Sequence, residues 1–147
     1  MRQLIIVRKD LDMSRGKIAT QCCHASLAFI LHGLSYTDAS FDVLDDSIEL
    51  TFESTYDIWQ DWFQDIYTKT ICEAKNKNHL LKAVSIAKEL GLREDKDFFL
   101  IKDRCLTELT PEEVDEDGLG CTLTAIGFKP LEDEIAHKIS KKYQLLK

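Results

Sequence analysis

Two segments of the sequence hold polar residues whose types and spacing could do chemistry. In the first, Lys17, Gln21 and His24 lie four and three residues apart, so on a helix they share one face. In the second, Asp103 and Thr107 lie four residues apart. A carboxylate and a hydroxyl at that spacing can orient one water or one ester group between them. Neither segment decides a function alone.

The start of the first helix is a possible anion site. Its free backbone N–H groups and partial positive charge favour an anion such as phosphate. Gly16 lies between Arg15 and Lys17, where the missing side chain permits close approach of a backbone or a ligand. The spacing of a glycine-rich nucleotide loop is absent. Two simpler alternatives stay open: the polar helix face is ordinary solvated surface, and Asp103 caps a turn.

The elements that must position these residues alternate between strand and helix. We expect strands at residues 4–7, 69–74, 98–101 and 121–128, with a short terminal strand at 143–146. Helices are expected from a Ser14 cap to Gly33, around residues 58–66, from an Asn78 cap to Gly91, and from Pro130 through residue 139. Residues 47–53 fit a loop, a short strand or a helix start.

This alternation predicts an α/β fold with three layers, α/β/α, around a mixed, mostly parallel four-stranded sheet. The link between the third and fourth strands is short, which leaves room for an antiparallel fourth strand. The 147 residues suffice for a single domain, 1–147. No apolar run approaches the roughly 20 residues that span a membrane, and the first residues contain no cleavage site, so we expect a cytoplasmic protein.

The cysteines and charges restrict the chemistry further. The five cysteines include an adjacent pair, Cys22 and Cys23, without disulfide or zinc spacing, so we expect no metal. Nothing in the sequence implies a cofactor. The net charge is −7, but fourteen acids are confined to residues 36–67 and 112–117. The rest of the chain carries +7, which allows a basic face.

Four ordered segments carry a family resemblance. MSRGKIATQCCHAS (residues 13–26) and FFLIKDRCLTEL (98–109) resemble two signatures of the type II peptidyl-tRNA hydrolases. TLTAIGFKP (122–130) resembles the final strand of that family, and KNHLLKAVSIAKELGL (77–92) resembles one of its helices. The similarity covers about 110 residues in order, as expected for a single domain.

The resemblance implies hydrolysis of the ester bond between a peptide and tRNA, with tRNA as partner and a homodimer as a possible assembly. It also implies catalytic residues Lys17, Asp103 and Thr107, with Gln21 and His24 lining the site. We add Arg8, Arg15 and Gly16 as substrate-binding residues. The RNA contacts are expected from a basic set at strand ends and the first helix: Arg2, Arg8, Lys9, Arg15, Lys17, Lys102 and Arg104.

The sequence departs from the family between Asp103 and Thr107, where small residues including glycine are usual. Here Arg104, Cys105 and Leu106 fill the gap, and the acidic segments would repel RNA phosphates. One alternative is therefore a non-catalytic protein- or RNA-binding module, with a partner surface at Trp59, Trp62 and Phe63. Another is an acyl or amide hydrolase for a small molecule. A catalytic thiol at Cys22 is disfavoured because that residue lies in the predicted buried stripe.

Overall fold

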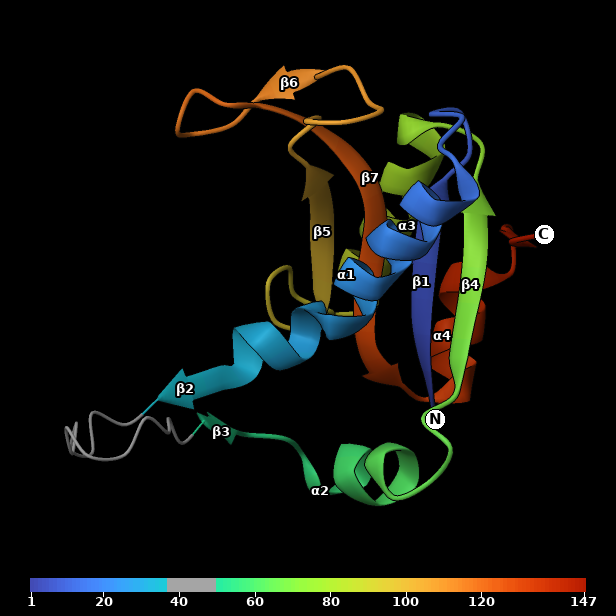
Figure 1. Cartoon of the computed structure of the whole chain (residues 1–147). Coiled ribbons are helices and arrows are strands. Elements are labelled where there is room, and N and C mark those ends of the chain that lie inside the picture. Colours follow the sequence, from blue (N-terminus) through green and yellow to red (C-terminus); the bar gives the residue numbers. More distant parts are fainter. Residues whose placement is uncertain (37–49) are drawn as a thin grey trace, which may run out of the picture.

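The computed structural model describes residues 1–36 and 50–147, and within them a six-stranded sheet forms the centre (Figure 1). Its strands are β1 (Arg2–Arg8), β4 (Lys69–Ala74), β5 (Phe98–Asp103), β6 (Glu113–Val114), β7 (Gly120–Leu131) and β8 (Gln144–Leu145). The helices are α1 (Arg15–Gly33), α2 (Tyr56–Ile58), α3 (Lys77–Glu89) and α4 (Asp133–Ser140). A π-helical turn (Trp59–Phe63) continues α2, and β2 (Leu34–Tyr36) pairs antiparallel with β3 (Leu50–Phe52) apart from the main sheet.

The prediction of a mostly parallel four-stranded sheet is wrong. The strand order is β5-β7-β1-β4-β8, with β6 beside β7. Among the described strands only β1 and β4 pair parallel, and the other pairs of the sheet are antiparallel. The reason is the position of β7, which returns without a helix and inserts between β5 and β1. Those two strands keep the common direction that helical crossovers give, so β1, β4 and β5 all end at the upper edge in Figure 1.

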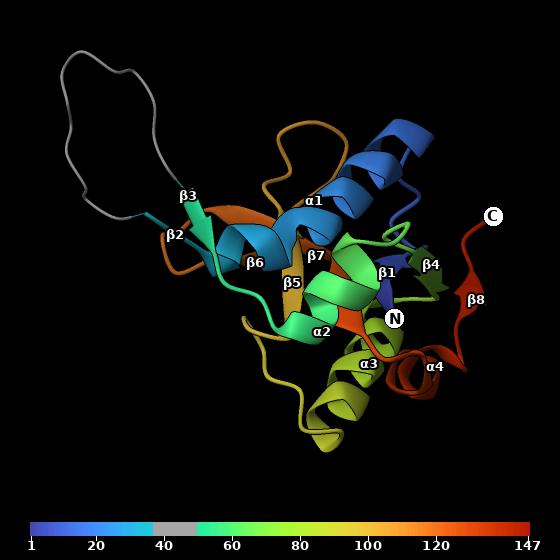
Figure 2. The same ribbon diagram turned by 90° about the horizontal axis from the view of Figure 1, so that it is seen from below.

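Helices cover both faces of the sheet, as predicted. Figure 2 shows α1 on one side and α3 with α4 on the other. Alternate residues of β1 supply the two cores: Leu4 and Ile6 belong to the cluster that contains residues of α3 and α4, while Ile5 and Val7 belong to the cluster that contains residues of α1. A strand buried on both faces accounts for the continuous apolar run at the start of the sequence.

Two contacts fix α1 against the sheet. Gly127 of β7 lies so close to the helix that a Cβ there would be 2.1 Å from the carbonyl oxygen of Ala25. At the edge of this contact, the Gln3 side-chain amide donates to the Ser26 carbonyl at 2.8 Å, and the Ser26 hydroxyl donates back to Gln3 Oε1 at 3.1 Å. These contacts set the position of α1, and with it the direction of its polar face.

The boundary at Ser14 was predicted correctly, whereas those at Asn78 and Pro130 were not. Ser14 caps α1 through its side chain, which accepts from the Lys17 N–H. The cap of α3 is Asn76, and the predicted cap Asn78 lies inside the helix. Pro130 does not open the last helix: it lies in β7 opposite Gln3, since strand pairing with β1 continues to the end of β7. The terminal strand is present as β8.

The aromatic segment packs mainly inward. Trp62 is 4% exposed and belongs to a cluster with Phe29 and Phe99, so it is not part of a partner surface, whereas Trp59 is 52% exposed. The helix expected around residues 58–66 is shorter in the structure. It ends with the π-helical turn at Phe63, which leaves Ile66 exposed. Of the undecided residues 47–53, the first three lie outside the described residues and 50–52 form β3. None of the helices in the described parts of the chain is long and apolar enough to cross a membrane.

Candidate active site

The structure brings together the residues that sequence reasoning proposed as catalytic. Asp103 is the last residue of β5, and Lys17 lies in the first turn of α1. The Lys17 ammonium lies 2.7 Å from Asp103 Oδ2 and donates a hydrogen bond to Thr107 Oγ1 at 3.2 Å. One lysine therefore contacts both the carboxylate and the hydroxyl. Its bond to Thr107 joins residues that are 90 positions apart in the sequence.

Asp103 has both carboxylate oxygens engaged. Besides Lys17, the Gln21 side-chain amide donates to Oδ2 at 2.9 Å, and the Cys105 backbone N–H donates to Oδ1 at 2.9 Å. Cys105 has φ +57°, in the left-handed region that glycine adopts most readily. The turn folds back so that its N–H reaches the carboxylate. Cys105 makes this turn at a backbone cost of roughly 1 kcal/mol.

The surroundings keep Asp103 ionised. The Lys17 and Asp103 side chains are only 13% and 12% exposed. Burial is the largest single influence and raises the pKa of Asp103, but the hydrogen bonds from Lys17, the Cys105 N–H and Gln21, together with the charge of Lys17, outweigh it, so the pKa lies below its usual value. Asp103 is thus a carboxylate at neutral pH, held against a lysine in a partly dehydrated site.

Glu108 clamps the loop after β5 onto the start of α1. Its carboxylate accepts from the Ser14 backbone N–H at 2.9 Å and from the Ser14 hydroxyl at 2.5 Å. Both bonds hold the pKa of Glu108 below its usual range, with the hydroxyl bond the larger cause. Since Glu108 follows Thr107 directly, the clamp places that hydroxyl beside Lys17. Sequence reasoning missed Glu108, because its partner is 94 residues away and no local pattern marks it.

Gln21 is held from behind by a residue of β7. The Thr124 hydroxyl lies 2.5 Å from Gln21 Oε1 and 3.1 Å from the Ile101 carbonyl oxygen. Gln21 is 1% exposed and Thr124 is fully buried. Gln21 therefore supports Asp103 from the interior and does not line an open surface. Sequence reasoning missed Thr124, which reads as an ordinary strand residue.

The remaining residues proposed on α1 lie outside this cluster. Arg15 and Gly16 are exposed at the helix start, and His24 is exposed further along the helix. A Cβ at Gly16 would meet only Ser14 Oγ, at 4.0 Å, so packing within the described residues does not require glycine there. The space above the first turn is open to a ligand.

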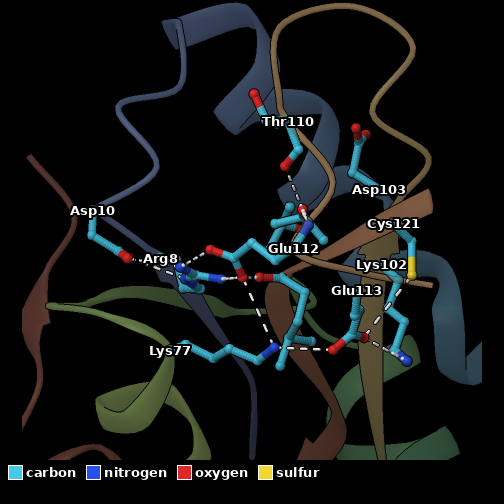
Figure 3. A network of polar contacts seen from close by, with 12 residues as sticks. Arg8, Asp10, Lys77, Lys102, Asp103, Thr110, Glu112, Glu113 and Cys121 are labelled. Atoms are coloured by element: carbon cyan, nitrogen blue, oxygen red, sulfur yellow. Dashed lines mark hydrogen bonds and ion pairs between the residues drawn. The ribbon is translucent and has the colours of Figure 1, made fainter. Parts of the chain in front are cut away.

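Arg8 lies in a different environment from the one expected of an RNA contact. Its side chain is 2% exposed. The guanidinium bonds to both oxygens of Asp10, to both oxygens of Glu112 and to the Leu123 carbonyl, at 2.7 to 3.0 Å (Figure 3). Because every direction of the fork is occupied from inside the protein, Arg8 joins the end of β1 to the acidic segment 112–117.

Three of the five acids of this segment, Glu112, Glu113 and Asp115, form ion pairs with neighbouring bases. Figure 3 shows Glu113 between Lys77 and Lys102, at 3.0 and 2.8 Å. These two lysines, Lys102 first, lower the pKa of Glu113 to about 2. Asp115 forms an ion pair with Arg104. Two of the expected RNA contacts, Lys102 and Arg104, therefore carry carboxylate partners from this segment.

The described residues offer little to a metal or to thiol chemistry. Across residues 1–36 and 50–147, no group of three or more His, Cys, Asp or Glu side chains is arranged to hold a metal ion. All five cysteines are free thiols. Burial, with a smaller effect of Cys23, raises the pKa of Cys22 to about 11, so this thiol stays protonated at neutral pH.

Fold and site together define a class of protein. An α/β domain carries a lysine, a carboxylate and a hydroxyl at one sheet edge, beside a helix start open to an anion, which suits hydrolysis of an ester in a phosphate-bearing substrate. Comparison with known proteins gives the family. The family described as Peptidyl-tRNA hydrolase PTH2 matches residues 1–146, and the chain belongs to it. The resemblance seen in the sequence is confirmed.

Similar proteins match over nearly the whole chain. The peptidyl-tRNA hydrolase of Methanopyrus kandleri is 30% identical over 146 residues, which cover 99% of this chain and 98% of that protein. That of Methanothermobacter thermautotrophicus is 30% identical over 146 residues, 99% and 100% of the two chains. That of Thermoplasma acidophilum is 26% identical over 145 residues, 99% and 97% of the two chains. The acidic segments thus lie within a chain that is similar from end to end.

Proposed function

We propose that the chain hydrolyses the ester bond of peptidyl-tRNA, or of an N-blocked aminoacyl-tRNA, at the site formed by Lys17, Asp103 and Thr107. The observation that supports these roles is the position of the Lys17 ammonium, 2.7 Å from Asp103 and 3.2 Å from Thr107, in a member of the peptidyl-tRNA hydrolase family. The ester carbonyl would approach this ammonium from the open side of the first turn of α1.

Each of the three side chains would have a separate role in ester hydrolysis. Lys17 places positive charge where the oxyanion of the tetrahedral intermediate forms. Asp103 accepts three hydrogen bonds and has a lowered pKa, so it is a weak base. Its role is to orient Lys17 and the attacking water rather than to hold a proton. Thr107 accepts from Lys17, so its hydroxyl can act as a relay: its proton passes to the leaving oxygen of the ribose while its oxygen takes the proton that the attacking water loses.

The tRNA would be bound at the start of α1. Arg15 and the open space above Gly16 suit a phosphate, because the N–H groups and dipole of the helix add to the arginine charge. His24 would contact the substrate further along the same helix. Gln21 acts through Asp103, and Arg8 supports the strand end that carries the site.

The test is release of free tRNA from N-blocked aminoacyl-tRNA by the purified chain, compared with Lys17→Ala and Asp103→Ala. Wild type should release tRNA, and both variants should lose turnover while circular dichroism shows an unchanged fold. Unchanged activity in both variants would remove the proposed site. The homodimer and the cytoplasmic location stay predictions, and light scattering on the purified chain would determine the oligomeric state.

A further inference from the structure

We propose that Thr124, buried in β7 and out of reach of substrate, is a positioning residue of the hydrolytic site that acts through Gln21 on Asp103. The inference rests on the proposed function of that site and adds a residue to it. Its basis is a chain of contacts from the interior of the sheet to the carboxylate: the Thr124 hydroxyl bonds to Gln21 Oε1, and Gln21 Nε2 bonds to Asp103 Oδ2.

A β-bulge aims Thr124 at the helix. In the pairing of β5 with β7, Ile101 lies opposite Ala125 but Lys102 lies opposite Leu123, so Thr124 is the extra residue on β7. The cores agree with this register: Leu123 packs in the cluster of α3 and α4, whereas Ala125 packs in the cluster of α1. In a regular strand these two residues would share a face. The bulge turns the side chain of Thr124 toward α1, and re-aiming a side chain beside an active site is a common use of a bulge.

The Asp103 carboxylate can only accept, so it determines which way the Gln21 amide points, and the Thr124 hydroxyl supplies the donor that this orientation requires at Oε1. An amide presents an acceptor at one end and donors at the other. The donor end of Gln21 faces Asp103 at 2.9 Å, so Oε1 faces Thr124 at 2.5 Å and is left without this donor if the hydroxyl is removed. With the amide reversed, Oε1 would face the carboxylate and repel it. No water can replace the hydroxyl easily, since Gln21 is 1% and Thr124 0% exposed.

Loss of the Thr124 hydroxyl would also affect the position of the Lys17 ammonium. Gln21 and Lys17 donate to the same oxygen, Oδ2 of Asp103. A fixed amide therefore fixes the oxygen that holds the ammonium, and a free amide lets both shift. Loss of the Thr124 hydroxyl should weaken the chemical step more than substrate binding, because no group that contacts tRNA is altered.

The experiment compares Thr124→Val, which keeps the shape and removes the hydroxyl, with Thr124→Ser, which keeps the hydroxyl. For Thr124→Val we expect kcat to fall by about 10-fold to 100-fold, the loss of one buried hydrogen bond to this network, with KM nearly unchanged. The acid limb of the kcat profile should move to higher pH, because Asp103 loses a donor that stabilises its charge. Thr124→Ser should recover most of kcat and the wild-type limb.

Ser26→Ala is the matched control. It also removes a side-chain hydrogen bond between α1 and the sheet, the one with Gln3, but does not reach Asp103. It should lower stability without moving the pH limb. If Thr124→Val does not fold, Thr124→Ala removes the same hydroxyl and is judged by the same outcomes.

A double variant gives an independent reading. Gln21→Met should reproduce the loss, and adding Thr124→Val to it should cost little more, because both act on one chain of contacts. Wild-type kcat and pH limb in a folded Thr124→Val, no recovery in Thr124→Ser, or additive losses in the double variant would each overturn the inference. Absence of turnover in wild type would instead overturn the proposed function.

Discussion

Replacing Lys17 with methionine is the most direct test of the site, because methionine keeps the length of the side chain and removes the charge. The ammonium has two partners, Asp103 at 2.7 Å and Thr107 at 3.2 Å, and both lose their donor. Removing one donor to an oxyanion typically lowers kcat by about 10²–10³-fold. We expect at least this loss in a single-turnover assay of tRNA release, since Thr107 is misplaced as well.

The same variant has a predicted effect on stability. Loss of a charged hydrogen-bond partner at a site about one-eighth exposed should destabilise the protein by roughly 1–3 kcal/mol at neutral pH. The pKa of Asp103 is lowered in the folded state, so this carboxylate contributes stability above about pH 4, which is lost as the pH falls through its folded pKa. Without Lys17 that contribution is smaller. Urea unfolding at neutral and acid pH should show a weaker pH dependence than in wild type.

Lys88→Met is the control. Lys88 lies at the exposed end of α3 and forms an ion pair with Glu94 at 2.9 Å, so its replacement changes the net charge by the same amount as Lys17→Met. It should keep wild-type turnover. The reasoning is refuted if Lys17→Met retains wild-type kcat, or if Lys88→Met loses as much activity, which would make the effect one of overall charge.

Three further predictions concern the surroundings of the site. Gly127→Ala should destabilise by at least about 1–3 kcal/mol and abolish activity, because the added Cβ would lie 2.1 Å from the α1 backbone; thermal unfolding measures this, and a wild-type Tm would contradict the close contact. Asp115→Asn should free Arg104, tighten tRNA binding and steepen its dependence on log salt by roughly 0.7–0.9, measured by filter binding; an unchanged slope would show that Arg104 does not reach phosphate. Lys102 and Lys77 lower the pKa of Glu113 to about 2 in the folded state, so the Glu113 carboxylate contributes stability above about pH 4.5 that is lost as the pH falls toward 2. Glu113→Gln removes this contribution, so the stability of the variant should vary less across that range than that of wild type.

The sequence predicted which polar residues lie together better than it predicted the order of the strands. The apolar run of β1, the Ser14 cap and the spacing of Lys17 and Gln21 are local signals, and they place a polar helix face beside the end of a strand. Since β1 and β5 both follow the direction set by helical crossovers, Asp103 was bound to arrive at the same edge. The insertion of β7 between them has no local signal, because an antiparallel and a parallel buried strand share the same apolar pattern.

The features that were missed depend on long-range contacts. Glu108 reaches back to Ser14, and Thr124 is re-aimed by a one-residue shift in pairing. Arg8 looked like an exposed basic residue at a strand end, but it is covered by Glu112 from a segment more than 100 residues later. The charge of a residue can be read from the sequence, but the residue that forms an ion pair with it depends on which segments the fold brings beside it.

The same partners reconcile an acidic protein with an RNA substrate. Glu112, Glu113 and Asp115 do not form an open negative patch, since Arg8, Lys102 and Arg104 form ion pairs with them. Those bases are then unavailable to phosphate, and Lys17 is held by Asp103, which leaves chiefly Arg15, exposed at the start of α1. Affinity for tRNA should therefore vary only weakly with salt, with about one phosphate neutralised, and recognition must depend on the start of α1 more than on a broad basic surface.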